Sequence, residues 1–353
     1  MARIELSGIN KSFGAQPALR DLSLTVEDGE FFVLLGRTGA GKTTILRAIA
    51  GLEKLDSGSI SIGGKDVGNW TAAERDVALV LQQYSLYPRL TVRGNLEFPL
   101  RSPARKLTES EISARVQQAA ATLQITHLMD RKVERLSGGE MQRVSIGRAI
   151  VRQPSVFLMD EPLSALDAKL RESLRVELKK LHRNLGATFL FVTHDQVEAM
   201  SMGDKVGVLR QGRLVQVGTP ADIYERPLNT FVARSVGSPP MNLIEGRLTS
   251  GMAELGAFRL PVNAANGAGG PVTFGVRPEN VVLDAGAPGE ARIFDIEDQG
   301  VVKTLVMDMG ETRLHVTVPA GTRVTRDEVV RFGWKPERVL TFDPQTGANL
   351  AMG

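Results

Sequence analysis

A glycine-rich loop near the start of the sequence has the residue types needed to hold phosphate groups. Residues 36–43, GRTGAGKT, match the pattern G-x-x-x-x-G-K-[ST]. The glycines let the backbone curl closely around an anion, and a helix beginning at Lys42 would add the positive end of its dipole. In this pattern the lysine reaches the terminal phosphates and the hydroxyl of Thr43 ligates Mg²⁺. The loop therefore predicts a site for a nucleotide and its metal ion.

The flanking segments favour this prediction over a chance glycine-rich turn. Residues 30–35 form an apolar run after Glu30, which is typical of a strand buried on both faces of a parallel sheet. A helical stretch from Lys42 to about Ala50 follows the loop. This order of strand, loop and helix is the context that the motif requires. A dinucleotide-binding turn is disfavoured because the pattern G-x-G-x-x-G is absent here.

Two adjacent carboxylates follow a second apolar run at residues 155–159. In a parallel sheet, ligands bind at the carboxyl ends of the strands. We expect Asp160 to hold Mg²⁺, directly or through water, and Glu161 to orient or deprotonate an attacking water. Alone, the pair would be better explained as ordinary turn acids. The phosphate-binding loop upstream favours the functional interpretation.

His194 ends a third apolar run, which begins at Thr188. A single histidine at a strand end is usually structural. This one falls on the edge where the other two strands deliver their phosphate and metal ligands, so it could contact the γ-phosphate and sense its loss. The remaining histidines, His127, His182 and His315, have no such context, and we assign them no role.

A second anion-binding sequence lies at residues 136–143, LSGGEMQR. Ser-Gly-Gly ahead of a helix offers free N–H groups, a hydroxyl donor and a helix dipole. In isolation, a serine cap followed by a glycine turn would be the ordinary explanation. One nucleotide does not need two separate anion sites in the same chain. The nucleotide predicted at residues 36–43 therefore does not explain the second site.

Together these motifs resemble the ATP-binding cassette of ABC transporters. Residues 136–143 resemble the LSGGQ-type signature motif of that family, with Glu140 where glutamine is common. The resemblance covers about the first 235 residues, with every expected motif in order. Residues 36–44 match Walker A, and residues 164–167 match the D-loop. Arg37, Thr38 and Leu81 depart from common family residues, but none of these departures removes a catalytic group.

The resemblance implies a role for each matching residue. Glu161 matches the catalytic glutamate, His194 the switch histidine and Gln82 the Q-loop glutamine. The implied Mg²⁺ ligands are Thr43, Gln82 and Asp160. The implied ATP contacts are Phe13, Gly36, Arg37, Thr38, Gly39, Ala40, Gly41, Lys42, Thr43, Thr44, Ser137, Gly138, Gly139 and Asp167.

The family also accounts for the second anion site. Two such domains face each other head to tail, so that Ser137, Gly138 and Gly139 of one subunit complete the ATP site whose Walker A belongs to the other. ATP binding closes this dimer and hydrolysis reopens it. The implied partners are a second ATPase subunit, identical or paralogous, two membrane permease subunits and an extracytoplasmic solute-binding protein. In the family, the aromatic segment after Gln82 contacts the permeases, and we expect Tyr87 rather than Tyr84 to do so.

Alternating strands and helices predict an α/β fold with a parallel-sheet core for residues 1–235. The resemblance implies that this fold is a P-loop NTPase cassette of the ABC type. Helical stretches at 107–129 and 138–152 suggest a helical lobe at about 83–155. The character changes near the sequence GSPP at 237–240. Short alternating segments at 272–276, 291–296, 304–307 and 313–318 then predict a second, β-rich domain at 236–353.

The second domain resembles an OB-like, TOBE-type regulatory domain. The sequences VGSPPMN at 236–242 and GVRPEN at 275–280 are similar to those of carbohydrate-importer ATPases of the maltose and glycerol-3-phosphate type. The resemblance implies an importer ATPase for a sugar or related polyol. The segments at 291–317 depart from the pattern enough to leave any regulator or effector site open.

Composition limits the remaining classes. The 353 residues carry 43 basic and 40 acidic side chains, a balance too even to indicate a nucleic-acid partner. The absence of cysteine excludes disulfides, Cys-ligated zinc and thiol catalysis. No apolar stretch is long enough for a signal peptide or a membrane span. The resemblance to importer ATPases implies a peripheral protein at the cytoplasmic face of the bacterial inner membrane.

Two alternatives stay open at this stage. The same engine could serve another small solute, such as a polyamine, sulfate or iron, because the ATPase never touches the solute. A soluble ABC ATPase of translation or DNA repair is the other. That class usually has two cassettes or a long coiled-coil insert, whereas this sequence has one phosphate-binding loop and one signature motif. Filter binding with single-stranded DNA or RNA would separate it.

Overall fold

The computed structural model describes residues 2–102, 105–263, 269–310 and 312–352. The chain folds as two compact units, Met1–Pro220 and Ala221–Gly353. Each unit has its own hydrophobic core. Within the described residues, no helix is both long enough and apolar enough to cross a membrane.

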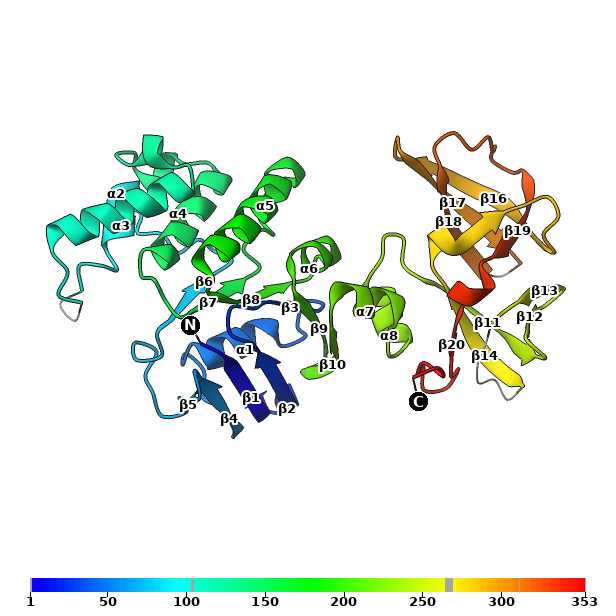
Figure 1. Cartoon of the computed structure of the whole chain (residues 1–353), viewed down its shortest axis with the longest axis horizontal. Coiled ribbons are helices and arrows are strands. Elements are labelled where there is room, and N and C mark those ends of the chain that lie inside the picture. The colour runs from blue at the N-terminus through cyan, green and yellow to red at the C-terminus, as the bar shows by residue number, and fades with distance from the viewer. Residues whose placement is uncertain (1, 103–104, 264–268, 311, 353) are drawn as a thin grey trace. The chain divides into compact units, whose positions relative to one another are not determined.

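The first unit is built around a mostly parallel sheet with the strand order β10-β9-β3-β8-β7-β6 (Figure 1). Its strands are β3 (Phe31–Leu35), β6 (Val77–Val80), β7 (Val156–Asp160), β8 (Thr188–Thr193), β9 (Lys205–Arg210) and β10 (Arg213–Gly218). Only β10 pairs antiparallel; the other neighbours are parallel. Every residue of β3, β7 and β8 is buried, which explains their continuous apolar sequences. The predicted α/β fold with a parallel sheet is confirmed.

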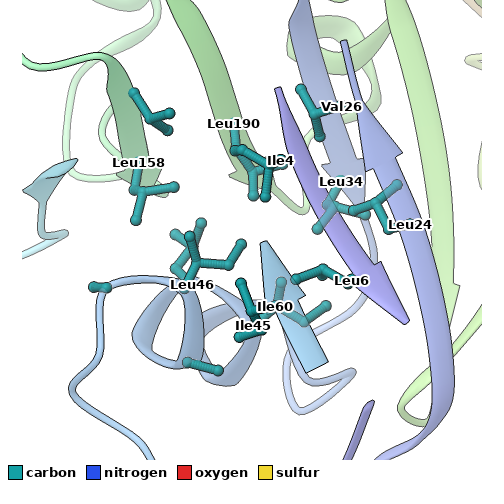
Figure 2. Packing of buried hydrophobic residues seen from close by; sticks show 14 of the residues in the cluster. Ile4, Leu6, Leu24, Val26, Leu34, Ile45, Leu46, Ile60, Leu158 and Leu190 are labelled. Atoms are coloured by element: carbon teal, nitrogen blue, oxygen red, sulfur yellow. The ribbon is translucent and has the colours of Figure 1, made fainter. Parts of the chain in front are cut away.

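A smaller antiparallel sheet, β2-β1-β4-β5, packs over the helix that follows the glycine-rich loop. Its strands are β1 (Ile4–Phe13), β2 (Gln16–Val26), β4 (Ser57–Ile62) and β5 (Lys65–Asp66). Figure 2 shows Ile45 and Leu46 of the helix α1 (Lys42–Ile49) among Ile4, Leu158 and Leu190. Because these side chains come from both sheets and the helix, one core fixes where α1 begins.

The helices beyond the sheet are α2 (Val92–Glu97), α3 (Glu109–Thr122), α4 (Gly138–Ile150), α5 (Ala168–Leu185) and α6 (Gln196–Met202), with short 3₁₀ turns at Thr126–Leu128 and Val133–Arg135. The predicted helix at 107–129 was too long. A capping box of Thr108 and Glu111 makes α3 begin at Glu109, two residues later than predicted. The left-handed backbone at Gln124, with φ of 57°, then separates α3 from the following turn.

The second unit begins within α7 (Pro220–Glu225), at Ala221, and continues with α8 (Thr230–Ser235) and two antiparallel sheets. The first has the order β13-β12-β11-β14-β20, with β11 (Asn242–Thr249), β12 (Met252–Leu255), β13 (Phe258–Pro261), β14 (Gly270–Val276) and β20 (Leu340–Phe342). The second has the order β15-β19-β16-β17-β18, with β15 (Val281–Leu283), β16 (Gly289–Asp298), β17 (Val302–Met309), β18 (Thr312–Pro319) and β19 (Val329–Trp334). The four segments predicted as strands lie in β14, β16, β17 and β18, so the β-rich second unit is confirmed.

Arg277 joins the helices of this unit to its sheets. The buried guanidinium donates to the carbonyls of Tyr224, Ala233 and Val236 at 2.6–3.1 Å and lies 3.9 Å from the centroid of the Tyr224 ring. The helices α7 and α8 are therefore fixed to the β-rich unit, whereas the sequence suggested a boundary at residue 236.

Candidate nucleotide-binding site

Residues 36–41 form the loop between β3 and α1, and their backbone needs glycine at particular positions. Gly41 has φ of 105°, and a Cβ atom added there would lie 2.7 Å from the carbonyl oxygen of Ala18. A Cβ added at Gly36 would lie 2.9 Å from the carbonyl oxygen of Leu209. Larger residues would push the loop away from its supports. Residues 37–39 are exposed at the turn, which leaves their backbone accessible to an anion.

Lys42 is the buried cation of this loop, with only 4% of its surface exposed. Its Nζ atom donates to the carbonyl oxygens of Gly36 at 2.7 Å and Arg37 at 3.2 Å. It also pairs with Glu161 Oε1 at 3.0 Å. A buried charge is costly without such partners. Lys42 is therefore held within the loop by the protein's own oxygens, in a position to exchange one of them for a phosphate oxygen.

Asp160 and Thr43 bring together oxygen atoms of the kind that Mg²⁺ prefers. The Thr43 hydroxyl donates to Asp160 Oδ1 at 3.1 Å. Burial raises the pKa of Asp160 above its usual value, and the neighbouring Glu161 charge adds to this effect, while the hydrogen bond from Thr43 opposes it. A bound cation would reverse this unfavourable environment. In the described part of the chain no three His, Asp or Glu side chains converge on one metal position, so the ion would need phosphate and water ligands as well.

Glu161 occupies the centre of the site. Its backbone is left-handed, with φ of 44°, and its N–H donates to the Val192 carbonyl at 3.1 Å. One carboxylate oxygen faces Lys42, and the other lies 2.8 Å from Nδ1 of His194. A non-glycine residue in this conformation is strained, and such strain persists where the surroundings hold the side chain in a particular direction. The backbone of Glu161 thus aims its carboxylate between the lysine and the histidine.

These side chains meet because their strands are neighbours. The sheet places β3, β8 and β7 side by side and parallel, so their carboxyl ends share one edge. The N–H of Gly36 donates to the carbonyl of Thr193 at 3.2 Å, which joins the phosphate-binding loop to the residue before His194. The predicted convergence of Lys42, Asp160, Glu161 and His194 on this edge is thereby observed.

Gln82 reaches this cluster through a residue that sequence reasoning did not assign to the site. Its Nε2 donates to the Ser164 hydroxyl at 3.2 Å, and that hydroxyl donates to the Glu161 carbonyl at 2.9 Å. Within the described contacts Gln82 has none to Thr43 or Asp160, so its predicted role as a Mg²⁺ ligand stays a prediction. Ser164 lies in the D-loop, and its position in that motif was the only feature of the sequence that could have assigned it to the site.

In the second anion site Ser137 is exposed, whereas Gly138 is partly buried and Gly139 is buried. Ser137 caps α4, and a capping box joins it to Glu140: the Ser137 N–H donates to Glu140 Oε2 at 2.7 Å, and the Glu140 N–H lies 3.4 Å from the Ser137 hydroxyl. The hydrogen bond from the Ser137 N–H holds the pKa of Glu140 below its usual value. In the described part of the chain no hydrogen bond or ion pair joins residues 137–139 to the phosphate-binding loop.

The remaining predicted contacts lie at the ends of their elements. Phe13 ends β1 with half of its surface exposed, and Nζ of Lys11 lies 5.1 Å from the centroid of its ring. Such an exposed ring could stack on a base. Asp167 caps α5 by accepting a hydrogen bond from the Leu170 N–H at 3.0 Å. Thr44 follows Thr43 in the first turn of α1.

Comparison with protein families identifies this architecture. The family model "ABC transporter" matches residues 19–164, "MalK OB fold domain" matches residues 237–281 and "TOBE domain" matches residues 274–342. Together with relatives that align over nearly the whole chain, these matches show that the chain belongs to the ABC transporter ATPases, in the group of importer subunits that contains MalK and UgpC.

Three curated relatives illustrate this group. The chain is 43% identical to the sn-glycerol-3-phosphate import ATP-binding protein UgpC of Ruegeria pomeroyi, over 99% of this chain and 100% of the relative. It is 44% identical to the trehalose/maltose import ATP-binding protein MalK of Thermococcus litoralis, over 98% and 99%. It is 41% identical to the trehalose import ATP-binding protein SugC of Mycobacterium tuberculosis, over 100% and 99%.

Solved structures match the cassette. The dimeric post-hydrolysis structure of the ATP-binding cassette MJ0796 bound to ADP and Pi has a TM-score of 0.56 and 30% identity, covering 62% of this chain and 98% of that chain. CbiO1 from Clostridium perfringens, part of the ABC transporter complex cbiONQ, has a TM-score of 0.59 and 27% identity, covering 63% and 90%. The chain is thus an ATP-binding ABC ATPase of the import type, as the sequence predicted.

Proposed function

We propose that this ATPase binds ATP with Mg²⁺ at the edge formed by β3, β7 and β8, and that its hydrolysis drives uptake of a sugar or related polyol. The observation that carries the proposal is the position of the Glu161 carboxylate, which bridges Lys42 and His194 beside the oxygens of Thr43 and Asp160. Each group needed for hydrolysis of a phosphoanhydride, namely a cation, metal ligands and a base, is therefore in reach of one point.

The bound nucleotide would change the partners of Lys42 first. The γ-phosphate would compete with Glu161 for the ammonium group of Lys42, because both are anions and this buried ammonium group already pairs with Glu161. Release from Lys42 leaves Glu161 free to accept a proton from the attacking water, while His194 still holds its other oxygen. Mg²⁺, held by Thr43 and Asp160, would neutralise charge on the phosphates. The products are ADP and phosphate.

A second ATPase subunit would complete the site. Ser137, Gly138 and Gly139 offer a helix N-terminus but make no described contact with the phosphate-binding loop of their own chain. The head-to-tail arrangement of the family supplies the missing side from another subunit. The similar cassette MJ0796 is dimeric in its structure bound to ADP and Pi, which supports the proposal of a second subunit.

The names of the relatives favour a sugar or glycerol phosphate as the transported solute. UgpC of Ruegeria pomeroyi is named for sn-glycerol-3-phosphate import, and MalK of Thermococcus litoralis for trehalose and maltose. Transport by a chain of this kind requires two permease subunits and a solute-binding protein, with the ATPase at the cytoplasmic face of the inner membrane. Polyamine, sulfate or iron import is the alternative, and the names of these relatives give it no support.

Uptake measured in cells that lack this gene would test the proposal. Radiolabelled sn-glycerol-3-phosphate, trehalose, maltose and putrescine are offered separately, and the gene is restored as wild type or as Glu161→Gln. We expect uptake of a sugar or the glycerol phosphate to return with the wild type alone. Uptake that is restored for putrescine only, or restored equally by Glu161→Gln, would contradict the proposal.

A further inference from the structure

The first turn of α5 carries an arginine whose two ends reach different motifs. One terminal nitrogen of Arg171 donates to the carbonyl oxygen of Leu166 at 3.0 Å, in the D-loop. The other lies 3.3 Å from Oδ2 of Asp195, the residue directly after His194. The planar fork of arginine is suited to holding two acceptors at fixed positions. Arg171 therefore ties the backbone of the D-loop to the loop that carries the switch histidine.

The Asp195 end of this connection is firmly held. The Asp195 N–H donates to the Thr193 hydroxyl at 2.9 Å, and Oδ1 of Asp195 caps α6 by accepting from the Val197 N–H at 2.7 Å. The Thr193 hydroxyl in turn donates to the buried carboxylate of Glu198 at 2.6 Å. A shift of the His194 backbone would therefore be transmitted to Asp195 and from there to Arg171.

The other end of the same helical turn contacts the signature motif. A Cβ atom added at Gly139 would lie 2.1 Å from Cδ2 of Leu170, so this leucine packs directly on the Gly139 backbone. Leu166, whose carbonyl oxygen accepts the hydrogen bond from Arg171, is buried. A Cβ atom added at Gly138 would lie 4.0 Å from Cδ2 of Leu166. The first turn of α5 is thus packed against the residues proposed to bind the partner's nucleotide.

We propose that Arg171 is a positioning residue that couples the two nucleotide sites of the dimer. Within one subunit it links His194, which faces the γ-phosphate of that subunit's own site, to the D-loop and signature residues that face the other site. The inference rests on the proposed function, because it requires that residues 137–139 act on a nucleotide bound by the partner. Loss of the link should uncouple the two sites while each one still binds ATP.

A structural role alone would predict a different result. The side chains of Arg171 and Asp195 are 32% and 25% exposed, and ion pairs with this much access to water contribute little to folding. Removal of the pair should therefore leave the fold and the ATP affinity of one subunit nearly unchanged. Misplacement of catalytic groups by as little as 1 Å, in contrast, can lower turnover by about 10²-fold.

The test compares Arg171→Met with Arg171→Lys, Asp195→Asn and the matched control Arg175→Met. Arg175 lies one turn further along α5, and in the described part of the chain it has no ion-pair partner. Asp195→Asn keeps an oxygen for the α6 cap and removes the charge. For each variant we would measure thermal unfolding, ATP affinity at subunit concentrations below dimerisation, turnover, and the Hill coefficient for ATP.

We expect Arg171→Met to lower turnover by at least about tenfold and to bring the Hill coefficient towards one, with ATP affinity within about twofold of the wild type. Arg171→Lys should restore part of the turnover, since lysine can reach one acceptor. The double variant with Asp195→Asn should be no worse than Arg171→Met alone, because both changes break one link. Arg175→Met should behave as the wild type.

Three results would overturn the inference: turnover and Hill coefficient unchanged in Arg171→Met, a loss of ATP affinity parallel to the loss of turnover, or an equal effect of Arg175→Met. ATP-dependent dimerisation of Glu161→Gln with Arg171 intact separates this failure from failure of the proposed function. If that dimer forms and Arg171→Met is still normal, only the link is wrong. If no dimer forms, the head-to-tail site itself is wrong, and with it the link.

Discussion

The phosphate-binding loop and the signature segment both place glycines at the start of a helix, yet their surroundings are opposite. Lys42 is buried and already holds a carboxylate and two carbonyl oxygens within its own chain. Ser137 is exposed, and in the described part of the chain the one printed hydrogen bond of its side chain comes from the N–H of Glu140 in its own helix. The first is a nearly complete anion site with an internal stand-in for phosphate. The signature segment is a surface that would need a second subunit to complete an anion site.

This difference indicates how the two segments divide the work. A buried cation with fixed partners can bind a phosphate without large rearrangement, because the protein has already removed it from water. An exposed helix N-terminus gains little from an anion while water surrounds it, and gains more when a second surface excludes the water. The asymmetry therefore favours ATP binding by a single subunit and hydrolysis only in the closed dimer.

Glu161→Gln should have the largest effect on this division. Glutamine cannot accept the proton of water, so we expect turnover to fall by about 10²–10⁴-fold. ATP binding should be kept, because neutral glutamine no longer competes with phosphate for Lys42. The variant should accumulate as a dimer with ATP on size-exclusion chromatography. Glu172→Gln, on an exposed face of α5, is the matched control. Normal ATPase rates in Glu161→Gln would refute its assignment as the base.

Ser137→Arg should separate the two segments. The bulky cation would occupy the place of the partner's phosphate, so we expect hydrolysis to be lost, with the ATP affinity of the single subunit changed by no more than about twofold. Isothermal titration at low protein concentration and a phosphate-release assay measure the two quantities. If the isolated subunit lost ATP binding, the signature segment would belong to its own phosphate-binding loop and the comparison would be wrong.

Gly139→Ala tests whether the signature segment depends on its contact with α5. The added methyl group would collide with Leu170, which must move or push α4 away. We expect turnover to fall by about tenfold, because a small displacement of positioned groups is costly. Adding Leu170→Ala should recover part of the rate by opening the space. A double variant as slow as Gly139→Ala would show that the methyl group acts through the nucleotide instead.

The smallest effect concerns Glu198, which accepts a hydrogen bond from Thr193, the residue that contacts Gly36 of the phosphate-binding loop. Burial raises the pKa of Glu198, although the hydrogen bond from Thr193 opposes this shift. A carboxylate with a raised pKa in the folded state stabilises the fold below its ordinary pKa and loses that contribution as pH rises through the folded value. Glu198→Gln should therefore be more stable than the wild type at pH 8, with a smaller difference in stability at pH 4.

Thermal unfolding at the two pH values measures this difference. Each difference of about 1 kcal/mol in stability would shift the unfolding midpoint by roughly 2–4 °C for a unit of this size. Equal destabilisation of Glu198→Gln at both pH values would mean that the carboxylate is ionised without penalty and that the hydrogen-bond geometry alone matters.

The meeting of the strand-end residues was predictable because it follows from topology. Each of Asp160 and His194 comes directly at the end of an apolar run, and parallel strands bring such ends to one edge. The pairing of Lys42 with Glu161 was not predictable, because it depends on the left-handed backbone of Glu161. Glutamate rarely adopts this conformation, so the sequence gives no indication of it.

Contacts between side chains that are distant in the sequence could not be predicted either. Arg171 and Asp195 are separated by a helix and a strand, and nothing in their spacing distinguishes them from other charged pairs. The same holds for the β-rich unit. Alternation predicted strands at 272–276 and 313–318, but their order in two sheets depends on which hydrophobic faces pack together.

A nucleotide-bound structure of Glu161→Gln would test the central claim most directly. The distance to measure runs from the Ser137 hydroxyl to the nearest γ-phosphate oxygen. We predict a hydrogen bond, at most about 3.5 Å, to an ATP whose phosphates are held by Lys42 of a second subunit. A structure with ATP bound and Ser137 more than about 7 Å from every phosphate, beyond reach of even a bridging water, would contradict the account.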